Sequence, residues 1–142
     1  MEQRISLITL GVADANAAAA FYDALGWRRV ETEEGIIAYD LLGQTLGLYP
    51  LAKLAEDIGI DVARLGRGAM TLGYNARDRA GVDDVMGRVE AAGGTVLKPP
   101  QEVFWGGYHG YFNDPDGHVW EVAHNPFSPL RDGDGAFRWM GY

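Results

Sequence analysis

Two titratable side chains near the C-terminal end of the sequence, Glu121 and His109, are of types that could do chemistry. Glu121 stands in the run VWEVAH, where Trp120 and Val122 point to one face of an expected strand and Glu121 to the other. A carboxylate on a well-buried strand needs a metal, a ligand, a hydrogen-bond network or access to water. His109 changes charge near pH 7 and could act as a general acid or base. Both also have plainer interpretations, because Glu121 could bond a polar neighbour and His109 could be a packed or surface residue.

The two strands that would position these side chains are joined by a tight turn. The turn sequence NDPDG at 113–117 contains a proline that presets φ, aspartates that bond back to the backbone and a glycine that accepts positive φ. The sequence therefore predicts strands at Tyr108–Asn113 and His118–His124, with Asp114 and Asp116 as turn formers.

Alternating and helical patterns predict the remaining elements, with Asp14 as a helix N-cap and Gly26 as a helix stop. Pro99 and Pro100 are expected to begin a loop. The other predicted strands are Ile5–Val12, Trp27–Thr32, Ile36–Asp40, Gln44–Tyr49, Ala69–Ala76 and Thr95–Lys98, and the predicted helices are Ala15–Leu25, Leu51–Ile58 and Gly81–Ala92.

The order of strand, helix and three strands occurs twice, so the sequence contains an internal repeat. The turn sequence YDLLGQ at 39–44 corresponds to NDPDGH at 113–118, with glycine fifth in both. The repeat predicts an α+β fold with an eight-stranded mixed sheet and helices outside it. Residues 127–142 fall beyond the repeat and are rich in aromatic side chains, so they could cover the domain, reach a second subunit or be partly frayed.

The stretch Phe112–Val122, FNDPDGHVWEV, near the end of a chain of this size resembles the vicinal oxygen chelate superfamily. That superfamily contains glyoxalase I, bleomycin-resistance proteins, extradiol dioxygenases and fosfomycin-resistance enzymes. The resemblance implies two βαβββ modules whose sheet curls around a cavity, and it points to the fold rather than to one activity. It divides the chain into a glyoxalase/bleomycin-resistance-like domain at 1–126, with modules at 4–50 and 68–126 and a linker at 51–67, and a C-terminal extension at 127–142.

The resemblance also implies where a metal would be held, on the first and last strands of each module. Glu121 matches the place of a Glu ligand, and Gly47, four residues after the turn glycine of module one, is its counterpart. The corresponding first-strand places are Leu7 and Thr71. Leucine and glycine donate nothing and threonine is a poor ligand, whereas a divalent cation needs about three nitrogen or oxygen donors. We therefore expect no family-type metal and predict no cofactor.

The cavity that the fold implies could still bind a small molecule. Glu121 and His109 are the candidates for catalysis. The ligand-binding candidates are Tyr49, Thr71, Asn75, Trp105, Tyr108 and Tyr111.

The first functional hypothesis is a metal-free protein that resembles the bleomycin-resistance branch and binds a planar or partly apolar compound. One alternative is an enzyme of the same superfamily, a lyase, isomerase or dioxygenase-like catalyst, with Glu121 as base or metal ligand. The other is an accessory module without chemistry. The resemblance further implies a homodimer.

The composition excludes several other classes. Twenty acidic against 12 basic residues give a net charge of −8, which does not suit a nucleic-acid surface. No apolar run approaches the roughly 18 residues of a membrane span, and the N-terminus is strand-like rather than signal-like. The chain has no cysteine, which excludes disulfides and thiolate sites and fits a cytoplasmic location.

Overall fold

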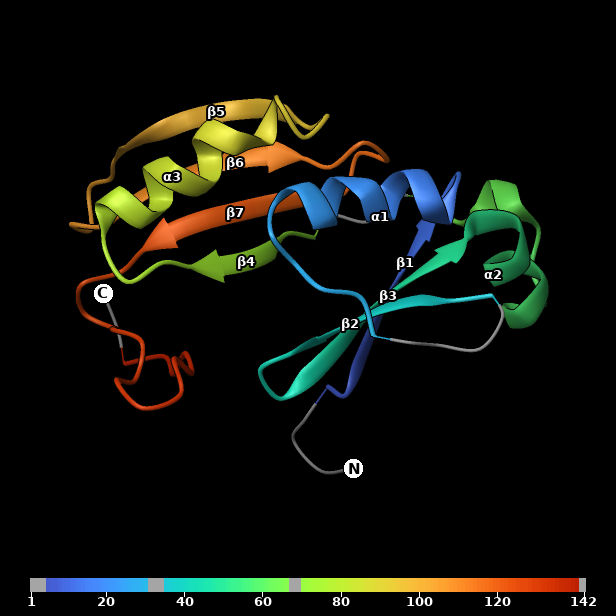
Figure 1. Cartoon of the computed structure of the whole chain (residues 1–142), viewed down its shortest axis with the longest axis horizontal. Coiled ribbons are helices and arrows are strands. Elements are labelled where there is room, and N and C mark those ends of the chain that lie inside the picture. The colour runs from blue at the N-terminus through green and yellow to red at the C-terminus, as the bar shows by residue number, and fades with distance from the viewer. Residues whose placement is uncertain (1–4, 31–34, 67–69, 141–142) are drawn as a thin grey trace. The chain divides into compact units, whose positions relative to one another are not determined.

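The computed structural model describes residues 5–30, 35–66 and 70–140, and it divides into two compact units, Met1–Gly68 and Ala69–Tyr142 (Figure 1). Each unit has its own sheet and at least one helix packed on it. Among the described residues, each helix is too short or too polar to cross a bilayer.

The first unit is built on a three-stranded sheet of order β1-β3-β2. The central strand β3 pairs in parallel with β1 and antiparallel with β2. The elements are β1 (Leu7–Val12), α1 (Ala15–Ala24), β2 (Ile37–Leu41), β3 (Gln44–Pro50), α2 (Leu51–Ile58) and the 3-10 helix η1 (Val62–Arg64).

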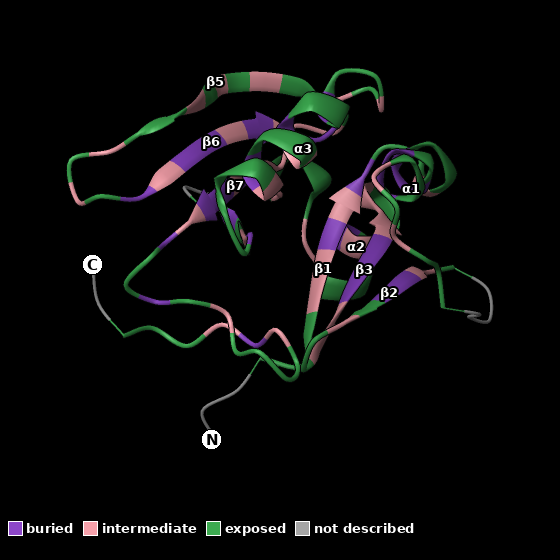
Figure 2. Cartoon of the chain, turned by 60° about the vertical axis from the view of Figure 1, so that its left-hand side comes forward, coloured by how far each residue is buried: buried purple, intermediate pink, exposed green. Residues whose placement is uncertain are grey.

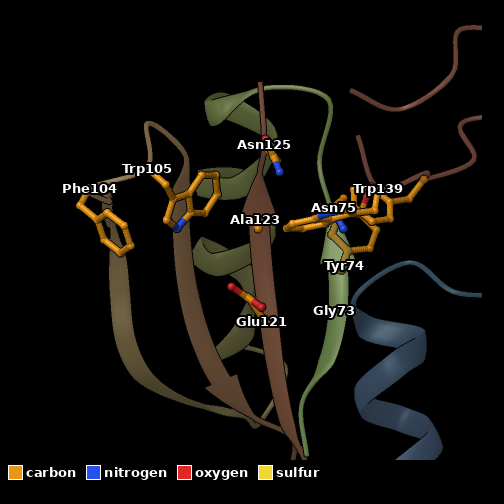
Figure 3. A pocket seen from close by; sticks show the side chains of 10 residues that line it. Gly73, Tyr74, Asn75, Phe104, Trp105, Glu121, Ala123, Asn125 and Trp139 are labelled. Carbon is orange, nitrogen blue, oxygen red and sulfur yellow. The ribbon is translucent and has the colours of Figure 1, made fainter. Parts of the chain in front are cut away.

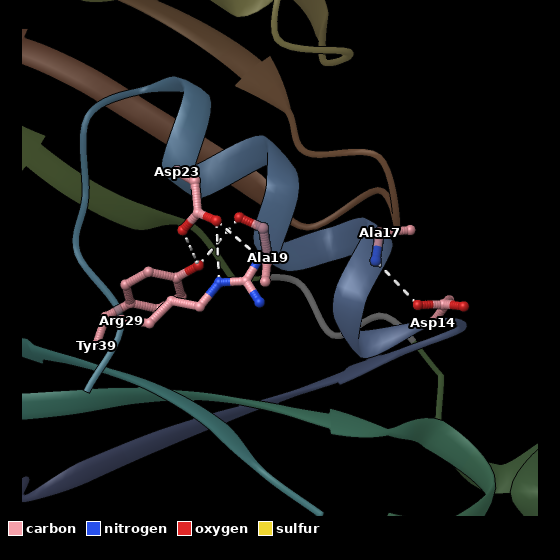
Figure 4. A network of polar contacts seen from close by, with 6 residues as sticks. All are labelled: Asp14, Ala17, Ala19, Asp23, Arg29 and Tyr39. Carbon is pink, nitrogen blue, oxygen red and sulfur yellow. Dashed lines mark hydrogen bonds and ion pairs between the residues drawn. The ribbon is translucent and has the colours of Figure 1, made fainter. Parts of the chain in front are cut away.

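Helix α1 begins and ends where the sequence predicts. The Asp14 side chain accepts a hydrogen bond from the Ala17 N–H at 2.9 Å, and Gly26 follows the helix with φ of 99°. The helix is held to the sheet by Tyr39 of β2, whose hydroxyl lies 3.0 Å from the Ala19 carbonyl oxygen and 2.9 Å from Asp23 Oδ1 (Figure 4).

The second unit is built on a four-stranded sheet of order β4-β7-β6-β5, in which β4 and β7 are parallel and the other pairs antiparallel. Buried residues concentrate on the two central strands, β6 and β7, whereas β5 alternates between intermediate and exposed residues (Figure 2). The elements are β4 (Leu72–Asn75), α3 (Arg79–Val89), β5 (Thr95–Glu102), β6 (Tyr108–Asn113) and β7 (Val119–His124).

Helix α3 covers one face of this sheet. Its buried residues, Val82, Met86 and Val89, belong to the core together with Phe112 and Trp120, whose rings stack at 6.1 Å. Burial of these apolar side chains supplies most of the driving force that holds the helix on the sheet. Helix α3 does not cover the opposite face of the sheet, which carries Glu121.

The repeat is visible in the hairpin turns that precede the last strand of each unit. Gly43 and Gly117 have φ of 83° and 86°, a conformation that glycine adopts without strain. In the second turn, the Asp114 side chain accepts hydrogen bonds from the Asp116 and His118 N–H groups at 3.0 and 2.8 Å. The turn prediction and the repeat are both confirmed at this level.

The predicted eight-stranded sheet is wrong, because residues 5–30, 35–66 and 70–140 form seven strands in two separate sheets. The missing strand is Trp27–Thr32, of which residues 31 and 32 lie outside the described residues. The part that is described makes a single isolated bridge, from Val30 to Ala38. This stretch packs on α1 instead, since Trp27 stacks on Tyr22 and Arg29 binds Asp23 at 2.7 Å.

The predicted loop from Pro99 onward is also wrong, because β5 continues through both prolines to Glu102. Proline lacks an N–H donor but is tolerated on the edge strand of a sheet, where one side of the backbone needs no partner. The pairing with β6 shifts register between Val96 and Lys98 and again between Lys98 and Gln101, which accommodates the prolines.

The segment after β7 folds back as an ordered loop. The buried Asn125 side chain accepts hydrogen bonds from the Phe127 and Ser128 N–H groups, and Ser128 Oγ accepts one from the Met140 N–H at 2.8 Å. Of the three alternatives for this C-terminal extension, the structure shows that its described part packs within the second unit, where two of its aromatic side chains border a pocket.

Candidate functional site

The sheet register explains which side chains share a face with Glu121. On β7, Glu121 lies opposite Gly73 of β4 and Tyr111 of β6, and Ala123 lies opposite Asn75 and His109. Paired residues on neighbouring strands point to the same side of a sheet. These six positions therefore form one surface, on the side of the sheet away from α3.

Four polar side chains on this surface are joined in a chain of contacts. His109 Nδ1 lies 2.8 Å from Glu121 Oε1, and the Tyr111 hydroxyl donates to the same oxygen at 3.1 Å. On the other side of the imidazole, Lys98 Nζ lies 3.1 Å from His109 Nε2. The side chain of His109 is 10% exposed and that of Glu121 is 29% exposed, so the carboxylate is more open to solvent than the imidazole.

Tyr111 acts in this arrangement as a hydrogen-bond donor. Burial, followed by the negative charge of Glu121 and the hydrogen bond to it, raises the pKa of Tyr111 above that of an ordinary tyrosine. The phenol therefore keeps its proton at neutral pH and donates a hydrogen bond to Glu121.

A pocket of about 450 Å³ opens over this surface (Figure 3). Glu121 lies on its floor, on β7, and is the one charged side chain among the described residues that line it. The lining residues are Gly73, Tyr74, Asn75, Phe104, Trp105, Glu121, Ala123, Asn125, Phe137 and Trp139. A volume of this size suits a small organic molecule.

Aromatic side chains border the pocket on two sides (Figure 3). Phe104 and Trp105 come from the β5–β6 loop, where a Cβ at Gly107 would overlap the Trp105 ring. The residue at 107 must therefore be glycine for the indole to lie where it does. On the opposite side, Phe137 and Trp139 come from the C-terminal extension, and their rings contact each other edge to face at 6.4 Å.

The structure brings together five of the residues that the sequence singles out. Glu121, Trp105 and Asn75 line the pocket, His109 and Tyr111 bond directly to Glu121, and the rings of Trp105 and His109 meet edge to face at 6.4 Å.

Two other ligand-binding candidates, Tyr108 and Thr71, lie outside this group, and a third belongs to the other unit. Tyr108 lies on the α3 side of the sheet, where its hydroxyl donates to Asp83 at 2.8 Å. Thr71 is exposed and precedes β4, and Tyr49 belongs to β3 of the first unit. The correction for Tyr108 follows from strand alternation, because it is one residue from His109 and must face the other way.

Sequence reasoning missed Lys98, Asn125 and the pocket role of Phe137 and Trp139. Lys98 escaped because the prolines after it were interpreted as a loop, although its alternation within a longer strand would have placed it beside His109. Asn125 follows the last predicted strand, and no sequence pattern indicated that this residue would line the pocket. The aromatic residues of the extension were noticed, but a sequence does not say where an irregular segment returns.

The residues beside Glu121 do not fit the metal that the family resemblance implies. The register places Gly73, rather than the predicted Thr71, directly opposite Glu121, and glycine supplies no side-chain donor. In the separate sheet of the first unit, Gly47 lies opposite Thr9. Within the described ranges, no three His, Cys, Asp or Glu residues are grouped to hold a metal ion.

Comparison with known proteins gives a consistent relationship. The sequence model of the glyoxalase/bleomycin resistance protein/dioxygenase superfamily matches residues 4–122. The chain is 37% identical to a glyoxalase-related enzyme from Fulvimarina pelagi, with 99% of this chain and 100% of that one covered and a TM-score of 0.89. No protein of curated function matches the chain.

Two further solved structures show how widely the fold is shared. A lactoylglutathione lyase from Agrobacterium tumefaciens is 25% identical, with 88% and 96% of the two chains covered and a TM-score of 0.67. A glyoxalase/bleomycin resistance protein/dioxygenase family enzyme from Burkholderia phytofirmans is 21% identical, with 84% and 96% covered and a TM-score of 0.73, and that likeness concerns the fold alone. The chain belongs to the glyoxalase/bleomycin resistance protein/dioxygenase superfamily.

Proposed function

We propose that the protein binds a small, planar, partly apolar molecule in the pocket of the second unit, with a hydrogen-bond donor of the ligand on Glu121 and no metal. The observation that carries this proposal is a pocket of about 450 Å³ with aromatic side chains on two sides and a single carboxylate on its floor. Aromatic walls favour flat ligands, because stacking and apolar burial act over the whole ring face.

The charge of the pocket also restricts the class of ligand that it can bind. Among the described residues that line it there is no lysine or arginine, and Glu121 is an acceptor. An anionic ligand would meet a carboxylate with no cation to offset it, whereas a neutral N–H or O–H donor or an organic cation is favoured. The five aromatic residues that line the pocket around this carboxylate also suit a cation over a ring face.

A binding titration with 9-aminoacridine, a planar amine that is cationic at neutral pH, tests the proposal. We expect the anisotropy of the dye to rise on adding the protein, and acridine-9-carboxylate, an anion of similar shape, to bind more weakly. Replacing Glu121 with Gln or Trp105 with Ala should each weaken binding of the amine about tenfold, because a charge-assisted hydrogen bond or a stacked ring is lost.

The matched control is Tyr108→Phe, which removes a hydroxyl on the opposite face of the same sheet. This variant should bind the dye as the unsubstituted protein does. Equal affinity of the unsubstituted protein, Glu121→Gln and Trp105→Ala, or no binding by the unsubstituted protein, would refute the proposal.

A second candidate function is base catalysis on the same site. It is supported by the contact of Glu121 with His109, and by the similarity to a protein described as a glyoxalase-related enzyme. A carboxylate in a partly apolar pocket can take a proton from a carbon next to a carbonyl group.

Proton exchange measures this activity directly. The substrate is 2-tetralone, a ketone fused to an aromatic ring, dissolved in deuterium oxide. If the protein catalyses proton abstraction, deuterium should enter the positions next to the carbonyl only when the protein is present, and proton NMR measures the rate. Glu121→Gln should reduce the rate to that of buffer, while Tyr108→Phe should leave it unchanged. Exchange that persists in Glu121→Gln would assign the base elsewhere.

A further inference from the structure

Lys98 contributes to the site without reaching the pocket. It stands on the edge strand β5, opposite Tyr111 in the register, and it is half-buried. Its ammonium lies 3.1 Å from His109 Nε2 and 5.8 Å from the centre of the Tyr111 ring. In the described parts of the chain, no carboxylate pairs with it, and it does not line the pocket.

This contact determines which nitrogen of His109 carries the proton. A lysine ammonium can only donate hydrogen bonds, so His109 Nε2 must accept, and the neutral ring then carries its proton on Nδ1. That proton points at Glu121 Oε1, which lies 2.8 Å from Nδ1, so the whole chain is a series of donors that ends at one carboxylate oxygen.

The consequence for Glu121 is that its two oxygens differ. Oε1 accepts from both His109 and Tyr111, whereas Oε2 accepts from no group in residues 5–30, 35–66 and 70–140. Two hydrogen bonds to one oxygen restrict rotation of the carboxylate, and the second oxygen is left for a donor in the pocket.

We propose that Lys98 is a positioning residue, which fixes the Nδ1–H form of His109 and through it directs Oε2 of Glu121 toward the ligand. Without the lysine, the imidazole can place its proton on Nε2, and the lone pair on Nδ1 then faces Glu121 Oε1. The lone pair on Nδ1 and the Oε1 oxygen are both acceptors and repel each other. The carboxylate therefore rotates, and Oε2 no longer points toward the ligand. The role of Lys98 rests on the proposed function only where ligand binding is measured, because the proton position of His109 is measured without a ligand.

The proton position on His109 is measured by 15N NMR of histidine-labelled protein, with the signals assigned by their loss in His109→Gln. The unsubstituted protein should show a protonated Nδ1 and an unprotonated Nε2. Lys98→Met keeps most of the apolar stem and removes the ammonium, and its His109 should shift toward the Nε2–H form. Lys98→Arg restores a donor cation and should restore the Nδ1–H form.

The same variants are titrated with 9-aminoacridine. Lys98→Met should bind the dye about tenfold more weakly, the loss expected when one charge-assisted hydrogen bond is misdirected, and Lys98→Arg should recover most of the affinity. The matched control is Lys53→Met, which removes an exposed lysine of α2 in the first unit and should alter neither measurement. Circular dichroism of each variant establishes that the fold is kept.

The proposal fails if His109 in Lys98→Met retains the Nδ1–H form, or if that variant changes its proton position and still binds the dye with unaltered affinity. If the unsubstituted protein does not bind the dye, the proposed function fails. The NMR result then still decides whether Lys98 sets the proton position of His109.

Discussion

At the scale of single residues, the candidate site depends on the contact between His109 of β6 and Glu121 of β7, whose Nδ1 and Oε1 atoms lie 2.8 Å apart. Alternation along one strand nominates Glu121, because its carboxylate lies on the face opposite Trp120 and Val122. His109 was also identifiable, but its contact with Glu121 was not, since that contact depends on the register of two strands. Lys98 was hidden by the two prolines that follow it. Single residues can thus be nominated from a sequence, whereas their contacts require the pairing of strands that the sequence leaves open.

A tyrosine in the first unit gives a residue-scale prediction on pH. Burial, followed by the hydrogen bond to Asp23 and the charge of that carboxylate, raises the pKa of Tyr39 well above its usual value. Because the unfolded chain ionises near pH 10 and the folded one only at higher pH, the stabilising contribution is full below about pH 10 and is lost as pH rises above it.

Tyr39→Phe should therefore lower the free energy of unfolding at pH 7 by about 1–2 kcal/mol, through the lost hydrogen bond. It should also lose less stability than the unsubstituted protein between pH 9 and pH 11. Urea unfolding at the three pH values measures both effects. Parallel pH dependence of the two proteins would show that Tyr39 ionises equally in the folded and unfolded states.

At the scale of elements, the prediction was close where local signals mark an end, although α3 runs from Arg79 to Val89 rather than over the predicted Gly81–Ala92. Asp14 and Gly26 define the ends of α1, and α2 has the predicted bounds Leu51–Ile58. Capping residues and glycines act locally, so a sequence displays them. The length of β5 depends instead on its place at the edge of the sheet, and the missing strand before β2 depends on the packing of Trp27 against α1.

The packing of α3 on its sheet gives an element-scale prediction. A Cβ at Gly110 would lie 2.9 Å from the Lys98 carbonyl oxygen and 2.9 Å from Met86 Cε, so Gly110→Ala should push the helix and β5 away from β6. Overpacking of this kind costs about 1–3 kcal/mol, and guanidinium unfolding should show a loss in that range.

Gly87→Ala is the control for the Gly110 substitution. It lies on the exposed side of α3, where a Cβ would have no neighbour within 4 Å among the described residues. It should stabilise the protein by roughly 0.5–1 kcal/mol, because alanine favours a helix over glycine. Equal effects of the two substitutions would mean that the close approach at Gly110 does not restrain the helix.

At the scale of the whole molecule, the repeat was readable from two turns and led correctly to an α+β fold, whereas the superfamily followed from the motif at Phe112–Val122. The repeat did not reveal that the strands divide into two sheets. The spacing of a repeat gives the number and order of the elements, but it does not determine which strands pair with each other. The candidate site was assigned to a cavity implied by the family fold. The pocket found here lies within the second unit and takes two of its aromatic residues from outside the repeat. The homodimer that the resemblance implies stays a prediction.

The return of the C-terminal extension has a practical consequence for anyone who purifies the protein. Trp139 borders the pocket, and the Met140 N–H donates a hydrogen bond to Ser128, so a purification handle at the C-terminal end would follow within a few residues of the pocket wall. Histidine-rich handles would also bring metal-binding groups close to Glu121 and could mimic a metal dependence that the native residues do not support. Affinity measurements and metal analyses are therefore best made on protein tagged at the other end, or with the handle cleaved.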